Sequence, residues 1–509
     1  MQSPGDASVP DVSQAFPAPE DVVDPPGIAD DGGESVGRRT LRGMFWAYGS
    51  YVGGRLLGLV ALSILARLLS VKDFGLVAIA LTFMTFLDTI KDLGLGQALI
   101  VGKPEELESR AQTVFGWTIV MGAVLSALTA LGSPFVARFF HEGSALAALI
   151  SVLGLNFFVR SLGATHYALA RKELDYRTRT FAEWSDVMTR GVVGIALALS
   201  GFGAWSLVIG YLVGSSALAI TVWRLVPFRP RLRLSREHLG NLLSFGGTLT
   251  LVDIGAAVAH EMDYWFTGRV LGATALGYYT IGFRLPELLI INLAVVAGNV
   301  LFPAYALLDH ERLRDAFLLS LRSTAMIVFP LAAGLGVMAH PVTIAFFGSG
   351  PKWLPSIEVM QVLVVYAVVV TLNIPGGTVL KATGQAWVLF ALTVPYVISQ
   401  FTALYIFADR GIVAVALCMA GMQALFLGIT WRVASRRLGV PLRRAVGVLW
   451  APFVAALGMG AALYPVERYV GSAWLALIVG AVVAVAVYGA LTWLLARDTL
   501  LRLRAAAQA

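Results

Sequence analysis

Long apolar segments constrain the fold of this chain more than any other feature of its sequence. Of its 509 residues, 58% are hydrophobic and 14% are charged, whereas soluble domains carry roughly 25% charged residues. A membrane-spanning helix requires about 20 mostly apolar residues. Fourteen segments meet this requirement: residues 44–69, 74–95, 114–133, 146–169, 182–200, 204–223, 242–268, 276–301, 317–339, 354–380, 387–407, 411–431, 446–464 and 473–495. We therefore predict an all-α polytopic membrane protein with fourteen transmembrane helices.

The basic residues indicate how these helices are oriented. Cytoplasmic loops of membrane proteins are enriched in Lys and Arg. With the amino terminus inside, 26 of the 38 basic residues fall in cytoplasmic segments and seven fall in outer segments. The cytoplasmic clusters include residues 171–179, 224–236 and 431–444. We therefore expect both termini to lie in the cytoplasm.

The first 37 residues differ from the rest of the chain. They contain six prolines, eight acidic residues and no basic residue, a composition typical of disordered segments. Because the whole chain has a net charge of +7, the remainder carries about +15. We assign this excess to loops that face an anionic membrane surface rather than to nucleic-acid binding. The single cysteine, Cys418, excludes an intrachain disulfide.

The sequence contains an internal repeat. A shift of 202 positions aligns residues 53–102 with residues 255–304 without a gap and places Arg67 on Arg269. In the second copy, residues 262–305 have the pattern of one helix end, a tight turn and the start of another helix. In a membrane protein, a duplication of this kind indicates a transporter.

The repeat predicts four parts of the chain. They are an acidic tail (1–37), a first lobe of six helices (38–238), a second lobe of six helices (239–437), and two further helices with a basic tail (438–509). Because each lobe has an even number of helices, both have the same orientation in the membrane. The pseudo-two-fold axis that relates them should therefore run along the membrane normal.

Charged residues inside the predicted spans are the candidates for function, because they are costly in a membrane and usually face a cavity or a partner. In the first half, Arg55 and Asp88 lie at matching depths. They either form an ion pair within the lobe or present a cation to a central cavity, and the two arrangements are compatible. Arg160 is a further candidate cation.

The second half holds a denser cluster of ionisable residues on both sides of the predicted turn: His260, Glu261, Asp263, Arg284 and Glu287. These residues either connect two helices through salt bridges or belong to a binding site. Pro286 cannot donate a backbone hydrogen bond, so we expect irregular helix geometry beside Arg284. Asn299 is a further polar candidate.

Motifs of soluble enzymes do not occur in the sequence. It has no Walker loop, no HExxH or GxSxG motif, and no Cys and His residues at metal-ligand spacing. We therefore expect neither catalytic residues nor a metal site.

Six segments carry a resemblance to a known family: residues 74–100, 229–235, 245–263, 262–279, 299–308 and 380–385. They are similar to the Wzx-type bacterial polysaccharide flippases, the polysaccharide transporter branch of the multidrug/oligosaccharidyl-lipid/polysaccharide exporter superfamily. The resemblance covers about residues 40–440.

This resemblance implies a multidrug-exporter-like (MATE-like) fold of two lobes around a V-shaped cavity. It implies that the protein flips undecaprenyl-diphosphate-linked oligosaccharide repeat units across the bacterial inner membrane by alternating access of the two lobes. The glycan would serve exopolysaccharide or lipopolysaccharide synthesis. The expected partners are membrane lipids and polysaccharide polymerase and export machinery, with the transporter acting as a monomer.

The resemblance also suggests roles for the candidate residues. We expect the following residues to bind the diphosphate: Arg55, Arg160, Arg284 and Asn299. We expect others to orient these groups or to bind a coupling ion, H+ or Na+: Asp88, His260, Glu261, Asp263 and Glu287. Arg67 and Arg269 match family positions at the two equivalent turns and should form an outer gate. No other cofactor is expected.

Other functions remain open on the sequence alone. An ion-coupled MATE-type exporter of small molecules and a lipid II flippase would share this fold. A membrane glycosyltransferase or polymerase would require a metal-binding acidic pair or a large catalytic loop, and the predicted loops are short and basic.

The predicted topology can be tested with reporter fusions. A reporter placed after Ala204 should lie outside the cytoplasm, and one placed after Arg236 should lie inside, because the basic cluster at residues 224–236 is predicted to be cytoplasmic. Activities of a periplasm-specific and a cytoplasm-specific reporter at both sites measure this. The same side for both fusions would contradict the topology.

Overall fold

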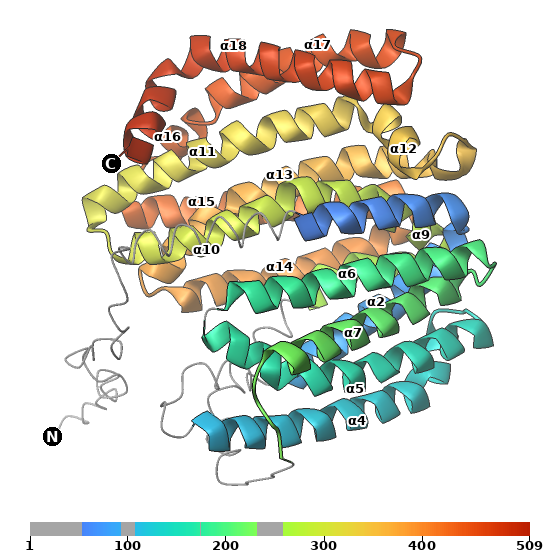
Figure 1. The fold of residues 1–509 in the computed structure, drawn as a ribbon. Coiled ribbons are helices and arrows are strands. Elements are labelled where there is room, and N and C mark those ends of the chain that lie inside the picture. Colours follow the sequence, from blue (N-terminus) through green and yellow to red (C-terminus); the bar gives the residue numbers. More distant parts are fainter. Residues whose placement is uncertain (1–52, 93–106, 174, 232–257, 509) are drawn as a thin grey trace, which may run out of the picture. The chain divides into compact units, whose positions relative to one another are not determined.

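The computed structural model describes residues 53–92, 107–173, 175–231 and 258–508. In these ranges the backbone forms helices joined by short turns and contains no β-strand, which confirms the all-α prediction (Figure 1). The predicted acidic tail, residues 1–37, lies outside the described residues.

The helices follow the predicted segments closely. The first half contains a helix over residues 53–68, α2 (Val71–Asp92), α4 (Leu107–Phe139), α5 (Ser144–Lys172), α6 (Tyr176–Leu199) and α7 (Ala204–Leu225). The second half contains a helix over residues 258–266, η3 (Thr267–Leu271), α9 (Gly272–Pro286), η4 (Glu287–Ile291), α10 (Asn292–Ala306), α11 (His310–Val337), α12 (Ala339–Phe347), η5 (Pro351–Trp353), α13 (Pro355–Ala382), α14 (Ala386–Phe407), η6 (Ala408–Arg410) and α15 (Ile412–Leu438). The chain continues with α16 (Leu442–Gly447), α17 (Trp450–Tyr469) and α18 (Ala473–Gln508).

Within the described part of the chain, nine helical segments are long and apolar enough to cross a membrane. They are Leu107–Phe139, Ser144–Lys172, Ala204–Leu225, His310–Val337, Pro355–Ala382, Trp387–Arg410, Ile412–Leu438, Leu442–Tyr469 and Ala473–Leu495. Each coincides with one predicted span. The total of fourteen spans and the lobe boundaries stay predictions.

In their described residues, both copies of the repeat fold as a helix, a corner and a second helix. The corners lie at Ser70 and Gly272, which are 202 positions apart. At the first corner, the Ser70 backbone N–H donates to Asp73 (2.9 Å) and the Asp73 N–H donates to the Ser70 hydroxyl (3.1 Å), which is a capping box. At the second corner, Gly272 has φ +84°, a conformation that glycine adopts without steric cost. The predicted turn is therefore confirmed.

The two copies contact each other through α2 and α9, and the contact is reciprocal. A Cβ atom on Gly75 would overlap the carbonyl oxygen of Ala273, and a Cβ atom on Gly277 would overlap the carbonyl oxygen of Val71. Because residues 71 and 75 are the repeat equivalents of residues 273 and 277, each copy presents the same surface to the other. Such a self-complementary contact is what two-fold symmetry produces, and it supports the predicted duplication.

Two apolar clusters surround this contact, and each combines residues from both halves. One joins Val71 and Phe74 to Ile281 and Trp353, with the Phe74 and Trp353 rings 5.6 Å apart. The other joins Ile79 and Phe140 to Ala273 and Leu276. Burying a large apolar side chain contributes about 1.5–3 kcal/mol, so these clusters hold the two halves together at this end of α2 and α9.

The C-terminal helices lie outside the repeat and pack on the second half. In Figure 1, α17 and α18 lie beside α11, and α18 also packs against α12. The Tyr488 hydroxyl donates to the Met326 carbonyl (2.8 Å), and the rings of Phe346 and Trp474 lie 5.7 Å apart. These contacts attach α18 to the two helices that precede η5.

The reciprocal contact predicts the effect of adding one methyl group. Gly75→Ala should force α2 away from α9, because the new Cβ meets backbone that cannot rotate aside. In a Cys418→Ala background, a cysteine placed at the buried Val71 should then react faster with a membrane-impermeant thiol reagent. Gly132→Ala is the matched control, because a Cβ on Gly132 would meet nothing within 4 Å. Unchanged labelling in a stable Gly75→Ala protein would show that this contact does not hold the halves together.

Candidate functional site

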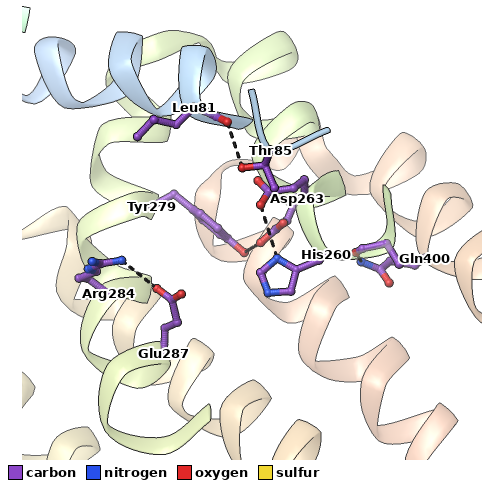
Figure 2. Close-up of polar contacts among 10 residues, drawn as sticks. Leu81, Thr85, His260, Asp263, Tyr279, Arg284, Glu287 and Gln400 are labelled. Carbon is purple, nitrogen blue, oxygen red and sulfur yellow. Dashed lines mark hydrogen bonds and ion pairs between the residues drawn. The ribbon is translucent and has the colours of Figure 1, made fainter. Parts of the chain in front are cut away.

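A buried carboxylate lies at the centre of the second-half cluster. Asp263, on the helix over residues 258–266, is 1% exposed. Its Oδ2 atom accepts a hydrogen bond from the Tyr279 hydroxyl of α9 at 2.6 Å, as Figure 2 shows. Its Oδ1 atom is buried and accepts no hydrogen bond from the described residues. The helices on the two sides of the Gly272 corner are therefore joined by an acid and a tyrosine, and one carboxylate oxygen is left available.

Aromatic rings enclose this carboxylate. The Tyr264 and Tyr279 rings pack edge to face with centroids 5.6 Å apart, and Phe283 lies 5.9 Å from Tyr366 of α13. An ionised carboxylate in such surroundings is expensive unless a cation or further donors compensate it. Asp263 is therefore suited to exchange between a protonated state and a cation-bound state.

Two neighbours of Asp263 are more accessible. The His260 Nδ1 atom lies 3.6 Å from the Glu261 Oε1 atom, and the His260 side chain is 56% exposed. Gln400 of α14 donates to the Ala259 carbonyl at 3.2 Å and brings a third helix to the cluster (Figure 2). The ionisable residues therefore extend from a buried position at Asp263 to an accessible one at His260.

Arg284 and Glu287 form an ion pair beside a change in helix geometry. The Arg284 Nη1 atom donates to Glu287 Oε2 at 3.2 Å, and their side chains are 42% and 28% exposed. Arg284 lies in the last turn of α9, and Glu287 begins η4, a π-helical turn. Because Pro286 lacks an N–H group, the α-helical ladder is interrupted and widens. The irregular geometry expected beside Arg284 is confirmed.

This pair does not connect two separate helices, because its members are only three residues apart. Among the described contacts of the cluster, the hydrogen bond between Tyr279 and Asp263 makes that connection. Sequence reasoning had overlooked Tyr279, although it lies about as far after the corner as Asp263 lies before it. The charged candidates were selected because they lie at similar distances from the predicted turn. The same comparison, extended to residues with hydroxyl groups, would have found Tyr279.

In the first half, one partner of Asp88 is on α5. Asp88 Oδ2 lies 3.8 Å from Arg160 Nη1, and the two side chains are 32% and 49% exposed. Arg55 lies on the helix over residues 53–68 and is half-buried. The structure thus brings together Asp88 and Arg160, two candidates that the sequence places 72 positions apart.

A second ion pair of the first half was not among the sequence candidates. Arg190 donates to Asp186, one turn earlier on α6, at 2.5 Å. The Arg190 guanidinium also lies 4.1 Å from the centre of the Tyr211 ring on α7, an attractive cation–π geometry. The spacing of four residues on one helix face is the signal that would have identified this pair.

Arg67 and Arg269 lie at the end of the α2–α9 contact, and each reaches across to the other half. Arg67 Nη2 donates to the Ala345 carbonyl of α12 at 2.5 Å. Arg269 Nη1 lies 2.7 Å from His141 Nδ1, in the turn between α4 and α5. We call this region, with its two arginines and their partners, the closed end. Asn299 lies on α10, but its side chain is outside the described part of the structure.

A lysine adds to the closed end from η5. Lys352 Nζ donates to the Ala66 carbonyl at 2.7 Å and also to the Leu69 carbonyl, and Trp353 Nε1 donates to Ala66 at 3.1 Å. Burial lowers the pKa of the Lys352 ammonium from its usual value. These bonds cap the carboxyl end of the helix over residues 53–68 with donors from the opposite half.

No group of three His, Cys, Asp or Glu side chains within the described ranges is arranged to hold a metal ion.

Comparison with known proteins identifies relatives over most of the chain. Residues 64–358 match a protein family described as "Polysaccharide biosynthesis protein". The succinoglycan biosynthesis transport protein ExoT of Rhizobium meliloti is 28% identical, over 92% of this chain and 96% of ExoT. The lipopolysaccharide biosynthesis protein WzxC of Escherichia coli is 28% identical, over 83% of this chain and 86% of WzxC. The teichuronic acid biosynthesis protein TuaB of Bacillus subtilis is 25% identical, over 70% of this chain and 74% of TuaB.

Solved structures confirm the predicted MATE-like fold. The lipid II flippase MurJ, in an inward closed conformation, matches 89% of this chain and 99% of its own with a TM-score of 0.74 and 15% identity. An inward-facing MATE family multidrug resistance transporter matches 76% of this chain and 94% of its own with a TM-score of 0.61 and 16% identity. At these identities the likeness establishes the fold alone.

The hydrogen bond between Tyr279 and Asp263 predicts a specific effect on stability. Tyr279→Phe should lower the thermal unfolding temperature in detergent, because a buried carboxylate that loses its donor costs about 1–3 kcal/mol. Adding Asp263→Leu should restore much of the loss, since no polar group then remains without its partner. Tyr278→Phe, the same change one residue earlier, is the control. An unchanged unfolding temperature for Tyr279→Phe would mean that the bond contributes nothing to stability.

Proposed function

The chain belongs to the polysaccharide biosynthesis protein family, and from this membership we propose that it flips undecaprenyl-diphosphate-linked oligosaccharide repeat units across the bacterial inner membrane. The product would serve exopolysaccharide or lipopolysaccharide synthesis. Relatives named for succinoglycan transport, lipopolysaccharide biosynthesis and teichuronic acid biosynthesis support a polysaccharide precursor as the cargo. Their cargoes differ, so they do not indicate one particular sugar.

The structural observation that supports this proposal is the presence of two half-exposed arginines within the predicted spans. Arg284 and Arg160 are 42% and 49% exposed, and each has a carboxylate within 4 Å. A charged side chain that faced lipid at this depth would be costly, so accessible charges there favour a water-filled interior. A guanidinium binds phosphate oxygens in a two-pronged geometry and stays protonated.

The carboxylates give these arginines a resting partner. Glu287 holds Arg284 at 3.2 Å, and Asp88 lies 3.8 Å from Arg160. An arriving diphosphate would replace a carboxylate as the partner of each guanidinium, so no arginine would be left uncompensated between cycles. Both pairs are partly exposed and therefore exchangeable, unlike a fully buried ion pair.

We assign the coupling ion, H+ or Na+, to the second half. Asp263 is buried beside Tyr279 and has one oxygen that accepts no hydrogen bond from the described residues. A proton or a sodium ion bound there would neutralise the carboxylate in its aromatic surroundings. His260 and Glu261 are more accessible and would pass the ion between solution and Asp263.

Transport would proceed by alternating access of the two lobes. The cavity would release its cargo on one side when α2 separates from α9 at the closed end, and would bind it on the other side when this end is closed. The polyprenyl chain would stay in the bilayer while the charged headgroup passes through the protein. In this function the protein needs no catalytic residue.

The cellular setting follows from the same proposal. The protein would lie in the inner membrane with both termini in the cytoplasm, where the lipid-linked repeat unit is assembled. It would act as a monomer and deliver its cargo to polysaccharide polymerase and export machinery.

Export should depend on the guanidinium of Arg284. Arg284→Ala should slow export about tenfold or more at normal abundance, since one hydrogen bond to a charged group contributes about 1.5–3 kcal/mol. Arg284→Lys should recover export only in part, because an ammonium keeps the charge but loses the two-pronged geometry. The measurement is mass spectrometry of lipid-linked glycan that accumulates in cells carrying each variant.

The matched control is Arg312→Ala. Arg312 forms an ion pair with Asp309, also three residues away, but at an exposed position. If Arg284 is only a structural residue, Arg284→Ala lowers abundance and adding Glu287→Ala restores it, because no unpaired charge then remains. Full export by stable Arg284→Ala and Arg55→Ala proteins would refute the proposed binding site. If a peptidoglycan precursor accumulates in these cells, or if no lipid-linked precursor accumulates, the protein carries a different cargo.

A further inference from the structure

Two equivalent arginines make contacts across the closed end. Arg67, at the end of the first helix of the first copy, donates to Ala345 in the second half. Arg269, its repeat equivalent, contacts His141 in the first half. Each arginine therefore binds the region that follows the third predicted helix of the opposite half. The duplication explains the reciprocity, but it does not explain the difference in chemistry between the two acceptors.

The two acceptors respond differently to protons. The carbonyl oxygen of Ala345 accepts a hydrogen bond at any pH at which the protein is folded. The His141 Nδ1 atom can accept one only while it carries no proton. The Arg269 guanidinium has no acceptor and does not lose its charge, so the 2.7 Å contact requires a neutral imidazole.

The turn that presents His141 has unusual geometry. His141 has φ +56° and, among the described residues, is the only one other than glycine with positive φ. Most side chains avoid this region, which glycine enters freely and which Asn, Asp and His enter more readily than other residues do. The turn is secured by its own hydrogen bonds, from the His141 N–H to the Arg138 carbonyl (3.1 Å) and from the Glu142 N–H to the Ala137 carbonyl (2.9 Å). The turn thus holds the imidazole of His141 next to Arg269, at a backbone conformation that glycine would adopt with less strain.

The nearby acid is already engaged. One oxygen of Glu142 accepts from the Ala273 N–H at the start of α9 (3.4 Å), and the other lies 3.5 Å from Lys72. The charged groups that lie along the turn of His141, or are joined to it by described contacts, are Lys72, Arg138, Glu142 and Arg269. Asp409 and Arg410 lie on η6, which packs against η3. Together these are four cationic and two anionic groups. A proton added to His141 would therefore enter surroundings with an excess of positive charge, directly against Arg269.

We propose that His141 and Arg269 form a proton-operated clamp: a neutral His141 holds the closed end shut, and its protonation releases it. The inference rests on the proposed transport function for its role in the cycle. His141 is exposed, so protons from the solution on that side reach it directly. Under the predicted topology this side is the outer one, and acidity there would favour opening toward the outside.

The pH dependence has a definite sign. A histidine ordinarily changes its charge between about pH 5 and 8. In its neutral form the imidazole accepts from Arg269 and favours the closed state. In its protonated form the hydrogen bond is lost and two cations face each other, so a lower pH favours release and a higher pH favours closure. The Arg67 contact stays intact in both conditions, so the change is a shift of equilibrium rather than complete opening.

The test uses the full-length protein in lipid nanodiscs, with Cys418→Ala and spin labels on Ser144→Cys and Thr274→Cys. Both labelled positions are exposed and lie on opposite halves of the closed end. Double electron–electron resonance then gives the distribution of distances between the two labels at pH 8 and at pH 5.5. A short distance corresponds to the closed state and a long distance to the open state. The ratio of the long-distance to the short-distance population should be about tenfold higher at pH 5.5, the effect of losing one hydrogen bond to a charged group.

Two substitutions separate the clamp from other titrating groups. His141→Asn keeps an acceptor oxygen that does not titrate and tolerates positive φ, so the short distance should persist at both pH values. His141→Arg carries a permanent charge and should give the long distance at both. His310→Asn, at an exposed histidine at the start of α11, is the control and should keep the full pH response.

The proposal is overturned if the parent protein shows no pH-dependent distance, or if His141→Asn responds to pH as the parent does. The second result stands even if His141→Arg fails to fold. The measurement needs no substrate, so it can fail while glycan export depends on Arg284 as proposed. Equally, loss of the export hypothesis would leave a pH-dependent distance in place, with its physiological role to be reassigned.

Discussion

The arrangement of the two halves depends on a place where helix backbones touch because side chains are absent. Gly75 and Gly277 let α2 and α9 approach until each glycine rests on a carbonyl of the other copy. No other residue type could occupy these positions without separating the helices. The apolar clusters, the Arg67 and Arg269 contacts and the capping by Lys352 all lie around this approach. In the proposed transport cycle the helices separate here, and they are held by two close glycine contacts and by relatively few polar bonds.

Helix α9 connects the closed end to the charged residues deeper in the bundle. It lies between two π-helical turns, η3 with Arg269 and η4 with Glu287. Along its length it also supplies Tyr279, the donor to Asp263. Wide helical turns are local irregularities that often occur at functional sites. A displacement of α9 from α2 would therefore act on the closed end, the buried carboxylate and the Arg284 pair through one continuous element.

The charged residues inside the bundle fall into two classes with different energetic roles. Arg284 with Glu287 and Arg160 with Asp88 are partly exposed, so water or an anionic ligand can compete for the guanidinium. Asp263 is almost fully buried, so only a proton or a small cation can change its state without a large desolvation cost. In the proposed function, this difference separates the groups that would bind the diphosphate from the one that would respond to a coupling ion.

Local patterns along the chain were enough to predict the helices, the duplication, the corner near Gly272 and the irregular turn beside Arg284, because apolar run length, glycine and proline act on neighbouring backbone. Depth along a helix was predictable too, since each residue adds a constant rise. The contact partners of the charged residues were not predictable from the sequence. Asp88 meets Arg160 on α5, and Arg269 meets His141 in a turn 128 positions earlier. Such pairings depend on the rotation and spacing of packed helices, which arise only when distant segments come together, and no periodicity in one segment records them.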